Sequence, residues 1–490
     1  MRKEKAILFS ALMLIPVFLT VSCAVFAAEP NVPAKRSLLD EFHNPTDWLE
    51  MGADLRFHMI FAKNIDTLSD DLPNNRENHW NYLRYRMRWW QKVKLDEDVD
   101  FNTRLVWEFR HWDEAPDRSK HVDFDEILFD RFNFTWRNMF DEPLTGVFGR
   151  QDIILGTGWL VLEGTPLDDS RTICFDALRL TYDWAEKDTT IDMIYIDQGA
   201  AEDRWLKPIN DRDRHFTEQD EHGLILYFTN KSLKDTQLEG YFIYKNDNPI
   251  DVTSKDEPAA WPSAVWSRKA EIYTLGGAIS GKLDDRWSYR AEGAAQRGDK
   301  ELPARVAMAD LEAYGFNSRL NYDFQDEKSN NLHIGYEYLS GDDPSSGTYE
   351  QFDPLWGEYA RLSELLAYSY NLETMIGEVT NLHRFNVGHS FKPWPKWQIE
   401  TDYHLLWADQ NTGKTSQYAY PWYEIVPNSG FQTSSRSDFR GHLFTLWVKW
   451  ACTNRLNWHW LTEYLSPGSY YSQGNRDGAY FLRLGVEYVF

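Results

Sequence analysis

Cysteine, long apolar runs and positive charge are all scarce in this chain. It has three cysteines among 490 residues, and beyond residue 27 no apolar run approaches the ~18 residues that a spanning helix requires. The histidines are scattered and no paired cysteine motif occurs, so the spacing indicates no zinc site. The formal net charge of −24 argues against a nucleic-acid-binding protein, which would carry a basic surface.

The one long apolar run lies at the N-terminus. A basic start precedes it, and small residues end it at Ala27, which predicts a secretory signal peptide over residues 1–27. Its removal takes away three basic residues and one acid, which changes the net charge from −24 to −26. A competing interpretation is lipidation at Cys23, but Thr20 stands where a lipobox has leucine. We expect the two remaining cysteines, Cys174 and Cys452, to be unpaired, although an oxidising compartment would permit a bond.

Aromatic residues, in contrast, are abundant: 22 Trp, 26 Tyr and 28 Phe. They occur in about eighteen segments that alternate apolar and polar residues, and the connections alternate between long polar loops and tight turns such as residues 96–98. Outer-membrane barrels combine aromatic girdles, long extracellular loops and short periplasmic turns. We therefore predict an all-β fold, a transmembrane antiparallel β-barrel of about 18 strands in the bacterial outer membrane, formed by residues 28–490 as a single domain. A soluble sandwich or propeller is the alternative, but the irregular spacing argues against a propeller.

The last thirteen residues, 478–490, alternate in the same way and end on Phe490. Apolar or aromatic side chains occupy one face, and Arg483 and Glu487 lie on the other. This ending resembles the terminal strand of outer-membrane barrels, which the barrel-assembly machinery recognises. We therefore expect that machinery and outer-membrane lipid among the partners of the chain, and no nucleic acid.

If the apolar face of each strand meets lipid, the polar face lines the lumen. The inward positions are then rich in arginine, although the whole chain is acidic. Arginine stays charged at any relevant pH and its planar fork matches a carboxylate, so rings of arginine favour anions in a pore. The competing interpretation is that these residues form ordinary cross-strand pairs that brace a wide barrel. The predicted inward residues are Arg84, Arg86, Arg88, Arg104, Arg110, Arg150, Arg179, Arg384, Arg483 and Glu487.

Several motifs resemble those of the alginate export family of outer-membrane porins. A Gly-Arg-Gln strand at residues 149–151 is followed by an Arg-Thr-x-x-Phe-Asp strand at residues 171–176, and YEYLSGDD follows at residues 336–343. The resemblance implies an eighteen-stranded barrel that secretes an anionic polysaccharide through an arginine-lined constriction partly occluded by loops. It also implies that Arg150 and Asp176 lie in the constriction. Asp176 shares its parity with Leu178, which alternation assigns to lipid, so either a β-bulge or a different register is required there.

The predicted function is a porin-like channel for passage, in the export direction, of an anionic polysaccharide such as alginate, with possible periplasmic secretion partners. The alternative is a general or nutrient-uptake anion-selective porin, and a third is a closed structural or adhesive barrel. We predict no enzyme. An outer-membrane lipase would need a serine beside a histidine and an acid or amide; His383 and Asn381 share one face, but no serine stands in a recognisable nucleophile setting near them. No cofactor is predicted; Ca²⁺ in acidic loops such as Asp168-Asp169 is the exception left open. Aromatic loops over residues 342–376 and 409–439 have the composition of a folded plug or of a sugar-stacking surface.

Overall fold

The computed structural model describes residues 38–65, 68–70, 78–114, 122–163, 174–200, 205–210, 217, 219–249, 268–302, 307–343, 345–357, 363–374, 379–411, 433–434 and 436–490. The predicted signal peptide, Asp168-Asp169 and most of the aromatic loop at 409–439 lie outside these residues. The chain divides into two compact units, Met1–His43 and Asn44–Phe490. Of the first unit the structure describes the short helix α2 (Leu38–His43). The second unit is the barrel.

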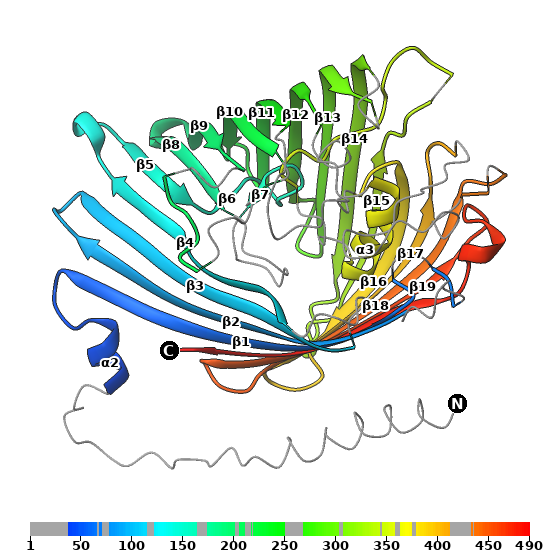
Figure 1. Ribbon diagram of the computed structural model, residues 1–490. Coiled ribbons are helices and arrows are strands. Elements are labelled where there is room, and N and C mark those ends of the chain that lie inside the picture. Colours follow the sequence, from blue (N-terminus) through cyan, green and yellow to red (C-terminus); the bar gives the residue numbers. More distant parts are fainter. Residues whose placement is uncertain are drawn as a thin grey trace. The chain divides into compact units, whose positions relative to one another are not determined.

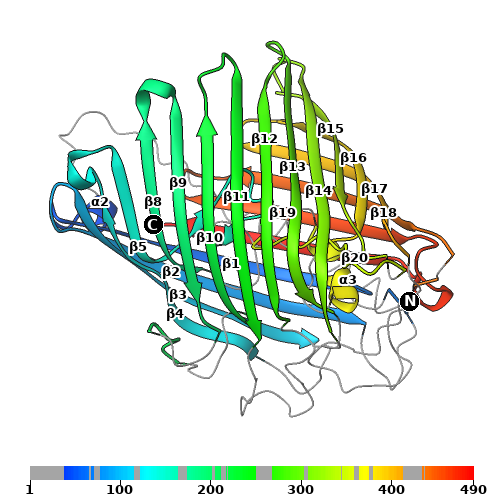
Figure 2. The same cartoon turned by 90° about the horizontal axis from the view of Figure 1, so that it is seen from above.

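Eighteen antiparallel strands form the barrel, which closes where β20 pairs with β1. Figures 1 and 2 show the strands following one another around the wall. The predicted fold class is therefore confirmed. The strands are β1 (Leu49–Lys63), β2 (His79–Lys94), β3 (Val99–Glu114), β4 (Val122–Trp136), β5 (Leu144–Gln151), β8 (Phe175–Trp184), β9 (Thr189–Gln198), β10 (Gln219–Asn230), β11 (Thr236–Pro249), β12 (Ala270–Lys282), β13 (Trp287–Glu301), β14 (Met308–Asp323), β15 (Asn331–Leu339), β16 (Leu382–Phe391), β17 (Trp397–Trp407), β18 (Phe439–Ala451), β19 (Leu456–Pro467) and β20 (Ala479–Val489).

Burial alternates along the strands as the sequence predicts. In β1, Leu55 is exposed, whereas its neighbour Arg56 and the next two residues of the same parity, His58 and Ile60, are buried. The outer face is apolar on strand after strand and the inner face is mixed. No helix in the described residues is long and apolar enough to span a membrane.

Short and long connections lie at opposite edges of the barrel. At one edge, tight turns join the strands, for example at Asp326, which accepts hydrogen bonds from the backbone N–H groups of Asn330 and Lys328. The bond from Asn330 is the main reason that the pKa of the Asp326 carboxyl lies below its usual value. The same edge holds the start of β1 and the end of β20. By the layout of outer-membrane barrels it is the periplasmic edge.

The wall is lower around β5, β8 and β9, which we call the low side, and again around β15 and β16, which have 9 and 10 residues. Strand β5 has 8 residues and β8 and β9 have 10 each, whereas β2 and β3 have 16. Pairing of β4 with β5 ends where Phe132 faces Arg150. Beyond that point the free edge of β4 bonds to a loop segment instead, because the Ile209 N–H donates to the Ile127 carbonyl oxygen at 2.6 Å.

Connections from the long-loop edge fold back into the barrel. We call them the plug: residues 153–163, which include the hairpin β6 (Ile153–Ile154) and β7 (Leu162–Glu163), residues 345–357, and helix α3 (Glu364–Thr374). Figure 1 shows α3 and the hairpin within the ring of strands. The plug carries many of the large apolar side chains that are buried inside the barrel, among them Trp159, Phe352, Trp356, Leu365 and Leu366.

Hydrogen bonds and ring contacts hold the plug together and to the wall. The Leu162 N–H donates to the Trp356 carbonyl at 2.7 Å, and the rings of Trp159 and Phe352 stack with centroids 5.6 Å apart. The Trp356 indole N–H donates to Glu221 of β10 at 2.8 Å. Asp353 forms an ion pair with Lys300 of β13, and both side chains are buried. The aromatic residues of 345–357 thus form part of a folded plug, one of the two interpretations of that loop.

Candidate functional site

A band of arginine crosses the inner face of β1, β2 and β3. Strand register places His58 opposite Arg84 and Arg84 opposite Arg110. One step toward the periplasmic edge, Arg56 faces Arg86. Directly paired residues of antiparallel strands have adjacent side chains, so the positive charges are contiguous. We call Arg56, Arg84, Arg86, Arg88 and Arg110 the arginine band.

Acidic residues form ion pairs with some of the arginines in the band. The Arg88 Nε lies 2.8 and 3.0 Å from the two oxygens of Asp54. Arg86 approaches the same carboxylate at 3.5 Å and Glu487 at 3.3 Å. Beside the band, Arg104 pairs with Asp130 at 2.7 Å and with Asp152 at 2.9 Å. These contacts are the cross-strand braces that the competing interpretation expects, and they fix the guanidinium groups in place.

Arg84 is different from its neighbours. Its side chain is 2 % exposed, yet none of its three guanidinium nitrogens has a hydrogen-bond acceptor among the described residues. A buried cation without a counter-charge is costly, because desolvation is not offset by an ion pair.

Arg483 connects the band to the plug. Its Nε donates to His459 Nε2 at 3.0 Å, and its guanidinium forms an ion pair with Glu364 in the first turn of α3. The guanidinium carbon lies 5.2 Å from the ring centroid of Trp447. The Leu365 N–H also donates to the buried Glu463 at 2.8 Å. Two contacts thus fix the N-terminal end of α3 to the inner wall, one through a carboxylate of the helix, Glu364, and one through a carboxylate of the wall, Glu463.

The remaining predicted lumen residues are distributed around the barrel. Arg110 lies 4.9 Å from the ring centroid of Trp112. Arg179 pairs with Asp192 at 2.8 Å on the low side of the wall, and Arg384 pairs with Glu337 at 3.0 Å on β15 and β16. Both of these pairs lie away from the arginine band in strand order, so the structure does not bring all the predicted residues into one site.

Arg150 and Asp176 do not lie in the lumen, where the family resemblance places them. Arg150 pairs in register with Phe132 and with Asp176, and it has the parity of the exposed Phe148. The next residue, Gln151, opposes Phe175, which packs against Trp356 of the plug. No register shift interrupts β5 and β8, so the parity of Arg150 and Asp176 is that of the outer face rather than the lumen.

The contacts of Arg150 explain why a charged pair can occupy this position. Its guanidinium binds both oxygens of Asp176 at 2.8 Å, and Nη1 donates to the Phe129 carbonyl at 3.0 Å. Trp205 covers the group, with its ring centroid 5.9 Å away. The pair closes the wall at the point where β4 leaves β5. It is a strand-end brace here.

Gly149 is the backbone counterpart of this brace. Its φ is +118°, and a Cβ there would lie 2.5 Å from the Phe132 carbonyl oxygen. We expect Gly149→Val to destabilise the barrel by about 1–3 kcal/mol, the usual range for a side chain in such a backbone region. Urea unfolding of the purified barrel, followed by tryptophan fluorescence, measures the change. Gly240→Ala is the matched control, because a Cβ at Gly240 meets nothing within 4 Å; equal midpoints for the two variants would contradict the expectation.

The profile of a family described as "Alginate export" matches residues 47–480. The chain belongs to the alginate export family. The match covers the barrel from before β1 into β20, so the resemblance seen in the sequence motifs is confirmed. None of the curated proteins matches the chain.

Solved structures of outer-membrane porins share the fold of this alginate export family member. A BenF-like porin from Pseudomonas fluorescens Pf-5 superposes with a TM-score of 0.54 at 12 % identity, over 90 % of this chain and 98 % of the porin. OccAB2 of Acinetobacter baumannii gives 0.55 at 10 % identity, over 90 % and 98 %. OccK2 of Pseudomonas aeruginosa, solved in complex with glucuronate, gives 0.52 at 11 % identity, also over 90 % and 98 %. Family and fold place the protein in the bacterial outer membrane as a porin-like channel.

Sequence reasoning missed three parts of this site. Arg56 lies on the polar face of a recognised strand, so alternation alone could have added it to the band. The role of Glu364 required the position of α3, which no periodicity reveals. Alternation could not tell the inward from the outward face of β18, where Trp447 lies beside Lys449, because β18 carries apolar residues on both faces near its periplasmic end.

Proposed function

We propose that the protein exports an anionic polysaccharide, such as alginate, through an arginine-lined lumen. The observation that carries the proposal is Arg84, a buried guanidinium inside the arginine band for which the described part of the chain offers no hydrogen-bond acceptor. A planar guanidinium matches the carboxylate of an acidic sugar, and the neighbouring acids keep such a sugar from binding too tightly to leave. Membership of the alginate export family supports a polysaccharide, and the glucuronate complex of OccK2 supports acidic sugars as ligands of this fold.

Partners and the absence of catalysis belong to the same proposal. The barrel-assembly machinery would insert the chain, outer-membrane lipid would surround it, and periplasmic secretion proteins would deliver the polymer. We propose no enzymatic role: His383 contacts Tyr336 at 2.8 Å and Asp409 at 3.1 Å, and neither partner is a serine. No group of His, Cys, Asp or Glu within the described part of the chain is arranged to hold a metal ion.

The test is the ion selectivity of single channels. Purified protein in a planar bilayer with a tenfold KCl gradient is expected to give a reversal potential of the sign that marks chloride permeation. Addition of polymannuronate is expected to block the current, and neutral dextran of the same length to leave it unchanged. A reversal potential that marks potassium permeation would overturn the arginine-lined lumen.

A general or nutrient-uptake anion porin is the second candidate. The plug favours it, because a barrel filled by Trp159, Phe352 and Trp356 leaves less room for a polymer than for a small solute. A swelling assay with liposomes separates the two. Rapid entry of monomeric uronates without passage of polymannuronate would favour the uptake porin.

A further inference from the structure

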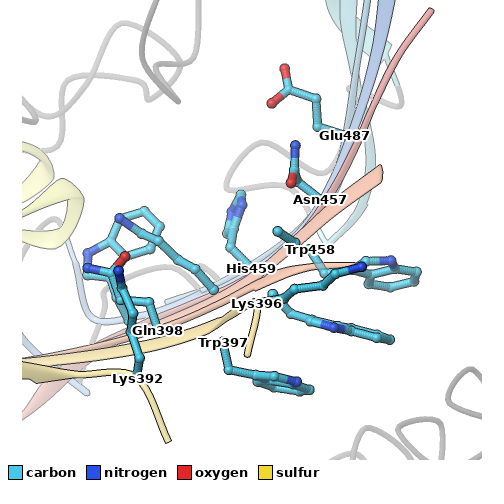
Figure 3. A pocket seen from close by; sticks show the side chains of 12 residues that line it. Lys392, Lys396, Trp397, Gln398, Asn457, Trp458, His459 and Glu487 are labelled. Atoms are coloured by element: carbon cyan, nitrogen blue, oxygen red, sulfur yellow. The ribbon is translucent and has the colours of Figure 1, made fainter. Parts of the chain in front are cut away.

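A cavity of about 480 Å³ lies at the periplasmic ends of β17 to β20. Figure 3 shows its lining, in which Glu487, Asn457 and His459 lie on one side of the ribbon and Trp397 on the other. The inner part of the lining is formed by Lys392, Gln398, Trp447, Lys449, His459 and Glu487. None of the described plug residues lines this cavity, and its residues lie at the periplasmic ends of their strands.

Strand register shows which of these side chains face the lumen. Trp447 and Lys449 have the parity of Leu443 and Thr445, which are buried inside the barrel. His459 opposes Lys449, and Leu461, of the same parity as His459, is also buried. The indole of Trp447 and the ammonium of Lys449 are therefore presented to the interior of the mouth.

The two lysines of the inner part of the lining differ from the arginines of the band. Lys392 and Lys449 are exposed, and the side chains of both are without an ion pair to the described residues. The Lys449 ammonium lies 4.8 Å from the centroid of the Trp447 ring. The chain as a whole has a net charge of −24, but two accessible lysines beside an indole make the local potential more positive here. Such a place favours an acidic ligand.

Trp447 also links the cavity to the arginine band. His459 lies 5.5 Å from its ring, and Arg483 lies 5.2 Å from it. His459 in turn contacts His58, with ring centroids 5.0 Å apart, and register sets His58 beside Arg84. A continuous row of cationic and aromatic side chains therefore leads from the mouth to Arg84.

We propose that this cavity is the first binding subsite for one hexuronate unit of the polymer. The carboxylate binds Lys449 and Lys392, and the sugar ring takes the place of the Lys449 ammonium on the Trp447 indole. Glu487, at the far side of the cavity, repels the carboxylate and so limits the affinity, which allows the unit to move on toward Arg84. The inference rests on the proposed function and adds to it a defined point of entry.

The test is titration calorimetry of the detergent-solubilised full-length barrel with a six-unit oligomannuronate. Lys392→Gln combined with Lys449→Gln is expected to weaken binding by on the order of tenfold or more, because the carboxylate loses both of its cationic partners. Trp447→Leu is expected to weaken binding of the oligomannuronate as well. Lys282→Gln is the matched control, because Lys282 ends β12 at the same edge and does not line the cavity; it should bind as the wild type does.

The outcomes separate this subsite from the proposed function. Wild-type affinity in the double lysine variant, or equal affinity of the wild type for neutral maltohexaose, would overturn the subsite. The arginine-lined lumen would still stand if the wild-type channel remained anion-selective. Heat-dependent mobility in gel electrophoresis confirms that each variant is folded before it is titrated.

Discussion

Replacing Arg84, Arg86 and Arg88 together with glutamine is expected to reduce the ratio of chloride to potassium permeability by about an order of magnitude. Unit charges ~8 Å apart interact by roughly 2 kcal/mol at an effective dielectric constant of ~20, and salt in the lumen screens part of this. Removing three adjacent positive charges also leaves Asp54 and Glu108 without their partners on β2, so the local field changes sign as well as size. Reversal potentials in a KCl gradient measure the shift.

The control for this experiment is Arg297→Gln. Arg297 is an exposed arginine of β13 that pairs with Glu312 at 2.6 Å, and its parity is opposite to that of the buried Gln296. Its loss removes one charge from the outside of the wall and should leave the reversal potential unchanged. Unchanged selectivity in the triple variant would show that the band braces the barrel without controlling the passage of ions.

Excision of residues 345–374, bridged by a short Gly-Ser linker, is expected to increase the single-channel conductance several-fold. These residues carry Phe352, Trp356 and helix α3, which fill the loop-side half of the barrel with buried side chains. Their removal also takes Glu364 from Arg483 and Asp353 from Lys300, which leaves two cations facing the widened lumen. Both changes favour a larger anion current.

Gly347→Ala is the control for the excision, since a Cβ at that position meets nothing within 4 Å. Its conductance should equal that of the wild type. Equal conductance in the excision variant would mean that ions already pass around the plug, and that residues 345–374 do not limit the current.

The sequence predicts the wall well because a barrel strand has the simplest of periodicities. One residue in two faces lipid, so β2 could be assigned side chain by side chain from the letters alone. The plug follows no period. Trp356 is buried because it meets Glu221 and Phe175, which lie far from it in the chain, and such contacts have no local signal.

Arg150 shows a different reason for failure. The family resemblance and the rule that charge faces the lumen both point inward, while alternation from Leu178 points outward. Alternation prevails, because an unbroken register leaves the side chain no choice of face. The charge is tolerated outside because Asp176 neutralises it and Trp205 covers it at the end of the strand.

The low side of the wall has a consequence for the surrounding membrane. A strand of 8 residues such as β5, at ~3.3 Å per residue and a tilt of ~40°, rises only about 20 Å, whereas the apolar band of such barrels is ~25 Å tall. The sixteen-residue strands β2 and β3 exceed that height easily. Hydrophobic mismatch is therefore expected at the low side and again at β15 and β16, and lipid there must thin to meet the short strands. The outer membrane would then be thinned locally beside these strands and not evenly around the barrel.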